Sequence, residues 1–311
     1  MPELPEVETV RAGLAPAVTN AKVLAVEILD ERSLKRHLAG PRDFVQTITG
    51  AKILAVVRRG KFLWMPLELH GAKAGDKKLA LVGHLGMSGQ MFLRKPSDPE
   101  DKLTRVVLKL ETARGKEVEF RFIDQRVFGS LAIDELVPTP DGKPGGYTST
   151  SATGKWWQNL IPASAAHISR DPLDPNFSET TVLAKVAKKH SGIKRVLLDQ
   201  QTISGIGNIY ADEALWASKL HYDQPADSIG NAKMRELLSN VKEILSKAVL
   251  QGGTSFDEQY KNVNGESGYF AVSLNAYGMT GTACKRCSTE IKRESWMNRG
   301  SHFCPKCQKL R

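Results

Sequence analysis

The four cysteines of the chain form two close pairs. "CKRC" contains Cys284 and Cys287, and "CPKC" contains Cys304 and Cys307. Two residues between paired cysteines allow a tight turn to point both sulfurs at one position, and two such turns supply the four thiolates of tetrahedral zinc. Two disulfides are the alternative, but disulfide-stabilised chains usually distribute their cysteines through the fold. We therefore expect one structural Zn²⁺ with no catalytic role.

The segment around these cysteines is strongly basic. Residues 274–311 contain eight Lys or Arg and two Asp or Glu, a net charge of +6. A basic zinc hairpin is suited to the DNA backbone, and Arg299, between the two pairs, is a candidate phosphate contact. For any one of these charges, a solvated surface side chain is the alternative.

A second motif is the glycine-containing stretch "SGIGNIYADE" at 204–213. Gly205 and Gly207 precede a predicted helix, so backbone N–H groups at the helix start could face a phosphate, and Asn208 could cap the helix or bind the phosphate itself. The stretch lacks a complete dinucleotide-binding pattern, and no strand pattern precedes it. A helix–turn–helix hairpin that grips a nucleic-acid backbone fits its helical surroundings better.

Three short stretches, "RRGKFL", "HLGMSG" and "DQRVFG", lie between residues 58 and 129. Their candidate functional residues are Lys61, His84, Met87, Arg126 and Phe128. Taken singly, each of these residues is as consistent with an ordinary surface or core side chain as with a function. Together they supply cations, a histidine and two apolar side chains, which could grip a bent duplex and fill the space left by an extruded base.

The start of the chain, "MPELPEVETV", predicts a helix over residues 5–18. Pro5 suits a first helical turn, and acidic residues complement the helix dipole there. Pro16 makes the last turn doubtful. The helix does not account for Pro2 and Glu3, which precede it.

The remaining elements follow from hydrophobic periodicity. From about residue 22 to 135 the apolar residues alternate, which predicts many short strands in a sandwich or barrel. Residues 137–155 are rich in Gly, Pro, Ser and Thr and predict a loop or linker. Four helices are predicted at 178–190, 192–201, 207–219 and 231–251. A long polar, glycine-rich loop at 251–270 is typical of a functional or disordered segment.

Composition limits the class of protein. The 311 residues suffice for about two domains, and 44 Lys and Arg against 34 Asp and Glu give a net charge of +10. Such an excess favours a polyanionic partner, most often nucleic acid. The chain has neither a transmembrane-length apolar run nor a secretory signal, so we expect a cytoplasmic protein.

Six motifs occur in order: "PELPEVETV", "RRGKFL", "HLGMSG", "D-x-R-x-F-G", "GIGNIYADE" and the four-cysteine finger. In this respect the whole chain resembles the bacterial formamidopyrimidine-DNA glycosylase family. The resemblance implies a multi-domain α+β fold: an N-terminal antiparallel β-sandwich with flanking helices, a helix–two-turn–helix domain and a β-hairpin zinc finger. The corresponding expected boundaries are 1–136, a linker at 137–160, 161–273 with a lesion-capping loop at about 251–270, and 274–311.

The resemblance also implies an activity: excision of 8-oxoguanine and formamidopyrimidines from double-stranded DNA, followed by β,δ-elimination at the abasic site. Removal of Met1 would expose Pro2 as the nucleophile, with Glu3 as the acid/base that assists sugar ring opening. Lys61 would bind phosphate and transfer a proton in β-elimination, and Arg299 would act in δ-elimination.

The remaining residues carried over from the family are DNA contacts. His84, Lys189 and Asn208 would bind phosphates. Met87, Arg126 and Phe128 would fill the void opposite the flipped base, with Arg126 facing the orphaned cytosine. The resemblance further implies a monomer associated with the nucleoid and one structural zinc.

Two positions depart from the family pattern. Val127 follows Arg126 where a second basic residue is common, and Leu103 replaces a DNA-contacting histidine of many members. The alternatives to this function are a DNA-binding protein that has lost its chemistry and a glycosylase of the pyrimidine-preferring endonuclease VIII branch. Intact Pro2, Glu3 and Lys61 argue against the first, and "EVET" after Leu4 argues against the second.

Overall fold

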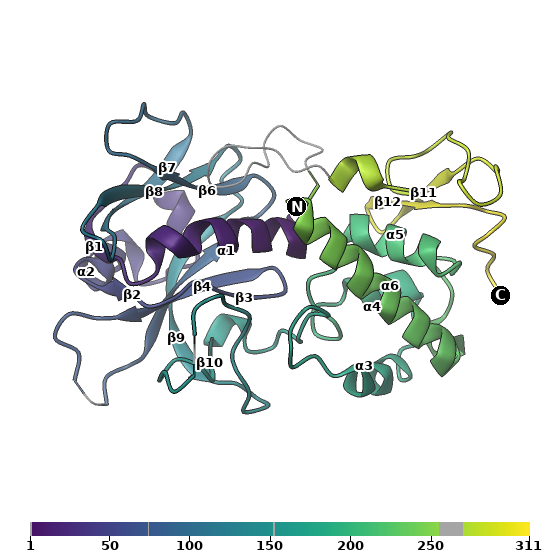
Figure 1. Cartoon of the computed structure of the whole chain (residues 1–311), viewed down its shortest axis with the longest axis horizontal. Helices are drawn as coiled ribbons and strands as arrows, with labels where there is room; N and C mark the ends of the chain where they lie inside the picture. Colours follow the sequence, from purple (N-terminus) through teal and green to yellow (C-terminus); the bar gives the residue numbers. More distant parts are fainter. Residues whose placement is uncertain (1, 74, 152, 255–269) are drawn as a thin grey trace. The chain divides into compact units, whose positions relative to one another are not determined.

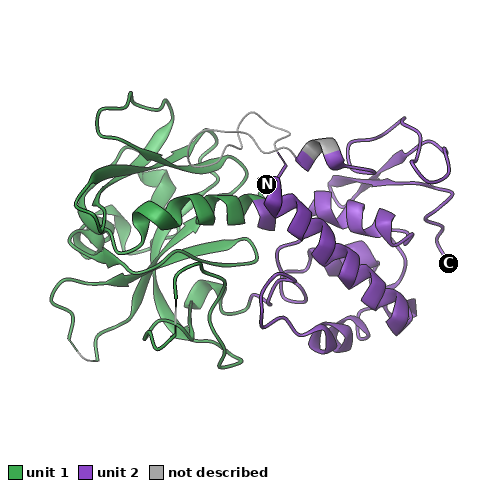
Figure 2. Ribbon diagram, in the orientation of Figure 1, with its two compact units in different colours: residues 1–2, 6–167, 255–268 green, residues 3–5, 168–254, 269–311 purple. Residues whose placement is uncertain are grey.

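The computed structural model describes residues 2–73, 75–151, 153–254 and 270–311. The chain divides into two compact units, coloured separately in Figure 2. Of the described residues, unit 1 contains Pro2 and Glu6–His167, and unit 2 contains Glu3–Pro5, Ile168–Thr254 and residues 270–311. The predicted capping loop lies almost entirely outside the described residues. Among those described, no helix has the length and apolar character needed to cross a bilayer.

Unit 1 is built on antiparallel strands, as the alternating pattern predicts (Figure 1). The strands are β1 (Lys22–Ile28), β2 (Lys52–Ile53), β3 (Val57–Arg59), β4 (Phe62–Glu68), β5 (Leu79–His84), β6 (Gly89–Arg94), β7 (Thr104–Glu111), β8 (Glu117–Asp124), β9 (Ser130–Pro138) and β10 (Leu160–Pro162). Their order is β10-β9-β5-β4-β2-β1-β7-β8-β6, and β3 pairs with β4. Short helical segments η1 (Glu31–Leu34) and η2 (Ala163–Ala165) connect some of them.

Two helices share one apolar core with these strands. Helix α1 (Leu4–Val18) begins with residues of unit 2 and continues through unit 1, and α2 (Gly40–Ile48) follows β1. The core holds Leu14 of α1 and Phe44 of α2 with residues from both halves of the strand order, such as Leu81 of β5 and Phe122 of β8. This arrangement buries the inward-facing half of each alternating strand, as a sandwich does. The last turn of α1, which Pro16 made doubtful, does form, since the helix continues to Val18.

The predicted linker is bound to the sheet of unit 1. Tyr147 exchanges two backbone hydrogen bonds with Arg58, of 2.9 and 2.7 Å. Gly146 lies so close to this strand that a Cβ would be 2.4 Å from the Arg58 carbonyl oxygen. The segment has no apolar period because backbone contacts, which any side chain permits, hold it in place.

Unit 2 contains the four predicted helices and a two-stranded hairpin. They are α3 (Glu179–Val186), α4 (Ile193–Leu198), α5 (Asn208–Ala217), α6 (Asn231–Leu250), β11 (Lys292–Trp296) and β12 (Arg299–Phe303), with short turns η3 (Ala226–Ser228) and η4 (Phe270–Ser273). Ser178 caps α3 by accepting a hydrogen bond from the Thr181 amide at 3.2 Å, which confirms the predicted cap. Leu4 packs into the core of this unit beside Tyr210 and Leu237.

A buried charged network attaches the hairpin to the helices of unit 2. Lys194 of α4 and Asp212 of α5 are 0% and 1% exposed, and their charged groups lie 2.6 Å apart. The Lys194 ammonium also donates to Ser301 Oγ (2.8 Å), and the His302 amide donates to Asp212 Oδ2 (2.9 Å). Burial lowers the pKa of Lys194, and the charge of Asp212 opposes that shift. Strand β12 is therefore held by buried charges. Because they are buried, water could not take the place of a partner that is removed.

We predict that Asp212→Ala destabilises the protein by about 3–5 kcal/mol, because it leaves the Lys194 charge buried and unpaired. The matched control is Glu243→Ala, which removes the exposed Lys247–Glu243 pair of α6 and should cost about 0–1 kcal/mol. Denaturant-induced unfolding measures both. Equal losses of stability would show that the buried network contributes no more than a surface pair.

Candidate functional site

The carboxylate of Glu3 binds the N-terminus of helix α5 within unit 2. Glu3 is 3% exposed. Its Oε2 accepts a hydrogen bond from the Gly207 amide at 2.6 Å, and its Oε1 accepts one from the Ile209 amide at 2.9 Å. The Leu4 amide donates to the Gly205 carbonyl at 3.0 Å. A carboxylate is favoured at this position because helix N-termini present free N–H groups and positive dipole.

The glycines of "SGIGN" permit this approach. A Cβ on Gly207 would lie 2.2 Å from Glu3 Cδ. Gly205 has a φ of +91°, and a Cβ there would lie 2.6 Å from Leu4 Cδ1. The suggestion that these backbone N–H groups face a phosphate is therefore wrong: the protein's own carboxylate occupies the helix start.

Asn208 does not cap α5. Gly207 is the N-cap residue and makes no side-chain cap bond. The Asn208 side-chain amide instead donates to the Gly300 carbonyl of β12 at 3.0 Å. The Asn208 side chain also hydrogen-bonds Tyr277: burial raises the pKa of the Tyr277 hydroxyl, and the bond from Asn208 opposes that shift.

Pro2 and Lys61 belong to unit 1. Pro2 is buried and directly precedes Glu3 in the sequence. Lys61 is half-buried and forms, with Gly60, the two-residue turn of the β3–β4 hairpin, whose last pair is Arg59 opposite Phe62. Gly60 has a φ of +55°, as such turns require.

A buried ion-pair network supports the Lys61 turn. Arg58 Nε donates to Glu8 Oε2 at 2.8 Å, and Arg58 NH1 donates to the Gly60 carbonyl at 3.1 Å. Arg11 completes the network by donating to both Glu8 oxygens. Glu8 of α1 thus orients Arg58, which in turn holds the residue before Lys61. From the sequence, Glu8 was expected only to complement the helix dipole, and Arg58 had no predicted role.

The loops of the predicted wedge residues are brought together by Asp124. This residue is 0% exposed, and its carboxylate accepts hydrogen bonds from the Gly129 amide (2.6 Å) and the Arg126 amide (3.1 Å). It also accepts one from Ser88 Oγ (2.5 Å), in the loop of Met87.

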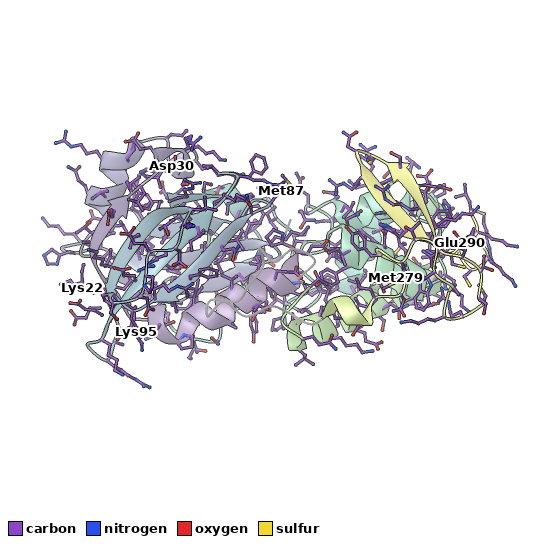
Figure 3. The ribbon with its side chains drawn as sticks, turned by 90° about the horizontal axis from the view of Figure 1, so that it is seen from above. Lys22, Asp30, Met87, Lys95, Met279 and Glu290 are labelled. Atoms are coloured by element: carbon purple, nitrogen blue, oxygen red, sulfur yellow. The ribbon has the colours of Figure 1, made fainter. Side chains whose placement is uncertain are left out.

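The same two loops touch through their backbones. A Cβ on Gly86 would lie 2.5 Å from the Phe128 carbonyl carbon. Met87 and Phe128 are 43% and 44% exposed, and Arg126 is also exposed. Figure 3 labels Met87 in the turn that joins β5 to β6. Two large apolar side chains therefore project from loops whose shape a buried carboxylate fixes. "DQRVFG" contains Asp124, but its function as an anchor depends on contacts that the sequence does not reveal.

Both departures from the family pattern have unusual backbones. Val127 has a φ of +54° and Leu103 a φ of +74°. The Val127 carbonyl accepts a hydrogen bond from Lys35 Nζ at 2.6 Å, and the Leu103 carbonyl accepts one from the Asp124 amide at 3.2 Å. Positive φ is strained for a β-branched residue and typically marks functional loops.

His84 ends β5 as a neutral imidazole. Burial and the charges of Arg36 and Lys35 lower the pKa of His84 to about 4. Its Nδ1 accepts a hydrogen bond from the Gly86 amide at 3.1 Å. At neutral pH Nε2 therefore carries the ring hydrogen, so this residue can offer a phosphate an N–H donor without a positive charge.

The two remaining cationic candidates lie in unit 2. Arg299 is exposed at the start of β12, directly after the two-residue turn of Met297 and Asn298. Lys189 lies at the surface, and its ammonium is 3.3 Å from Asp199 Oδ2. Arg299 is thus positioned on a hairpin tip, whereas Lys189 has an acidic partner.

The four cysteines form a metal site. All four sulfurs lie within 4.8 Å of one another, and none is in a disulfide. At a zinc–sulfur distance of about 2.3 Å, tetrahedral sulfurs would be about 3.8 Å apart. The donor set and its spacing therefore fit Zn²⁺, with all four positions provided by the protein.

The contact between Gly207 and Glu3 generates a prediction. Gly207→Ala should destabilise the protein by about 1–3 kcal/mol, because the added methyl group displaces the Glu3 carboxylate. Gly230→Ala is the matched control: Gly230 is the N-cap residue of α6, and in the part of the chain that the structure describes no atom beyond its sequence neighbours lies within 4 Å of its added Cβ. Thermal unfolding of the two variants gives the comparison, and equal shifts would mean that Glu3 is not held against Gly207.

A second prediction concerns His84 and pH. Its pKa is about 4 in the folded protein against 6.5 for an ordinary histidine. Between these values the unfolded chain binds the proton more readily, so folding stability contributed by His84 is lost as pH falls from 6.5 towards 4. His84→Asn should therefore show a shallower loss of stability over this window in denaturant unfolding. Parallel curves for variant and wild type would contradict a neutral His84 in the folded protein.

The chain matches three family models that together cover most of its length. They are the formamidopyrimidine-DNA glycosylase N-terminal domain over residues 1–131, the formamidopyrimidine-DNA glycosylase H2TH domain over 168–259, and the zinc finger found in FPG and IleRS over 281–310. These matches confirm the predicted fold class and the structural zinc bound by the four cysteines.

Curated proteins and solved structures agree with these models. The chain is 54% identical, over the full length of both proteins, to formamidopyrimidine-DNA glycosylase of Leifsonia xyli. It is 48% identical to that of a Nocardioides species, over 99% of this chain and 94% of the relative. A Lactococcus lactis Fpg bound to DNA with an abasic site has a TM-score of 0.77 at 29% identity, over 99% of both chains.

A mutant of the Lactococcus lactis protein bound to Fapy-dG DNA has a TM-score of 0.78 at 30% identity, over 99% of this chain and all of that chain. Domain models, curated relatives and solved structures thus identify the same family over the whole chain. The chain belongs to the formamidopyrimidine-DNA glycosylase family.

Proposed function

We propose that this DNA repair glycosylase is bifunctional. In this proposal it removes 8-oxoguanine and formamidopyrimidines from double-stranded DNA and then cuts the strand as an abasic-site lyase. The solved Lactococcus lactis relatives are complexes with DNA that contains an abasic site or Fapy-dG, the substrate and intermediate types that such an enzyme meets.

The observation that carries the proposal is the fixed Glu3 carboxylate. The amides of Gly207 and Ile209, at the start of α5, hold its oxygens, and the preceding residue is Pro2. Removal of Met1 would turn Pro2 into a terminal secondary amine directly attached to this fixed residue. A terminal amine has an ordinary pKa of about 8, so about a tenth is free base at neutral pH, far more than for lysine.

In the first half of the reaction, the Pro2 nitrogen takes the place of the damaged base on the sugar. The Pro2 nitrogen attacks the sugar C1′, the bond from C1′ to the base breaks, and the base leaves with a proton. Glu3 acts as the acid/base that assists opening of the sugar ring. The product is an iminium, whose positive charge makes it an electron sink.

The second half cuts the strand. The iminium acidifies a hydrogen on C2′; when that proton is removed, electrons flow to C3′ and the 3′-phosphate leaves. Lys61, on its supported turn, binds phosphate and transfers the proton in this β-elimination. Arg299, exposed on the tip of the β11–β12 hairpin, contacts the phosphate that leaves in δ-elimination.

Other residues hold the DNA. Asn208 offers a phosphate its side-chain amide once it exchanges Tyr277 for phosphate. His84 offers a neutral Nε2–H donor, and Lys189 offers a cation once it exchanges Asp199 for phosphate. Met87 and Phe128 enter the duplex where the base has left, and Arg126 faces the orphaned cytosine. The fixed shape of the loops that carry Met87 and Phe128 favours this role, because flexible loops would lose more conformational entropy when their side chains enter the duplex.

Two other functions make different predictions. A DNA-binding protein without chemistry would bind damaged DNA but form no covalent adduct. A pyrimidine-preferring glycosylase would excise thymine glycol faster than 8-oxoguanine. A Lactococcus lactis Fpg has been solved with DNA containing an oxidised pyrimidine, so binding alone does not separate these specificities.

Borohydride trapping tests the chemistry. Incubated with an 8-oxoguanine:C duplex and borohydride, the wild-type protein should become covalently attached to the DNA. Pro2→Gly should reduce the trapping rate about tenfold or more, because a primary amine gives an imine that loses its charge more easily. Equal trapping of wild type and variant would remove Pro2 from the mechanism.

The same assay includes its controls. An undamaged duplex should give no adduct, and excision of 8-oxoguanine is compared with excision of thymine glycol. A clear preference for thymine glycol would contradict the proposed substrate while leaving the lyase chemistry in place.

A further inference from the structure

The C-terminal end of α5 is attached to the first cysteine pair of the zinc finger. Arg286, which lies between Cys284 and Cys287, donates from NH1 to the Ala217 carbonyl at 3.2 Å and from NH2 to the Trp216 carbonyl. Its guanidinium carbon lies 3.9 Å from the centroid of the Trp216 ring. Arginine is favoured at a helix C-terminus and stacks well on aromatic rings. One side chain therefore connects the metal-binding turn to the helix.

Two N–H groups at this junction lack ordinary partners. Trp216 Nε1 and Arg286 Nε are both buried, and neither has an oxygen or nitrogen acceptor among the residues described. Trp216 packs against the small core of Cys284, Ile291 and Cys304, as does Met279, which Figure 3 labels. Buried donors without partners are rare in proteins and usually indicate a missing ligand or ion.

A zinc–thiolate centre would supply what these donors lack. Four thiolates around Zn²⁺ leave two negative charges spread over the sulfurs. The Trp216 ring already packs against Cys284, and its buried N–H has no hydrogen-bond partner among the described residues. The indole contact is looser than a full hydrogen bond. Charge on the sulfur would strengthen it.

We propose that Trp216 and Arg286 stabilise the bound zinc through its ligands. The Trp216 N–H donates to the Cys284 thiolate, and Arg286 fixes the cysteine pair to the last carbonyls of α5. Zinc retention then depends on a helix that contributes no metal ligand. The first residue of that helix is Asn208. The candidate DNA contact and the anchor of the zinc site therefore lie at opposite ends of one helix.

Zinc release from the full-length zinc-loaded protein tests the proposal. A chelator removes the metal while a colorimetric zinc indicator records the rate. Trp216→Phe keeps an aromatic ring for Arg286 to stack on but removes the N–H. Because outer contacts to metal ligands typically change metal affinity about 10–100-fold, we expect zinc release about tenfold faster or more.

Trp296→Phe is the matched control in the same finger. Trp296 packs near Lys194 and Tyr222, so its substitution should leave the release rate unchanged. Cobalt substitution adds a spectroscopic readout: loss of a hydrogen bond to the thiolate should move the sulfur-to-cobalt charge-transfer band of Trp216→Phe to longer wavelength. A packing defect alone would not shift this band.

A second variant keeps the test decisive if Trp216→Phe does not fold. Arg286→Lys retains the charge but cannot stack or donate to two carbonyls in a plane, so it too should release zinc faster than wild type. If Trp216→Phe has the wild-type release rate and band position, Trp216 is not a donor to the zinc site. If Arg286→Lys releases zinc at the wild-type rate, Arg286 does not anchor the site.

Discussion

The hydrogen bonds from the Gly207 and Ile209 amides to Glu3 determine the geometry of the candidate active site in unit 2. They fix a carboxylate next to Pro2 in the sequence, and they use the free N–H groups at the start of α5. A helix N-terminus stabilises negative charge only within its first turn, so the position of Glu3 follows from the position of the helix. Two glycines, Gly205 and Gly207, are required because any side chain there would collide with the N-terminal segment. The chemistry proposed for the first residues thus depends on residues two hundred positions later.

Helix α5 is also held by contacts at its middle and at its C-terminal end. Asp212, halfway along, holds β12 through Lys194 and the His302 amide, and Arg286 binds the last carbonyls. The zinc finger is therefore attached to the same helix that positions Glu3 and Asn208. In this account a structural metal would affect the residues proposed for the reaction indirectly, because it would stabilise the hairpin and turn that contact the helix.

Some of these features are readable from the sequence and others are not. The cysteine spacing predicted the metal site because few sequence spacings allow four thiolates to coordinate one ion tetrahedrally. The alternation of apolar residues in 106–122 predicted strands because every second side chain of a strand faces the core. The backbone N–H groups of "SGIGN" were assigned to a phosphate because a sequence shows that donors exist, not which acceptor reaches them. Asp124, Glu8 and Arg58 were not predicted as supporting residues for the same reason. Their partners are distant in sequence, and a buried carboxylate looks the same in a sequence as an exposed one.

The central claim is that the terminal nitrogen of Pro2 performs the chemistry. Its most direct test is peptide mapping by tandem mass spectrometry of the borohydride-reduced protein–DNA adduct, after nuclease digestion leaves a small sugar remnant on the protein. The account predicts that the remnant is on the nitrogen of Pro2, in a chain that has lost Met1. A remnant on Lys61 or any other lysine, or on a chain that retains Met1, would contradict it.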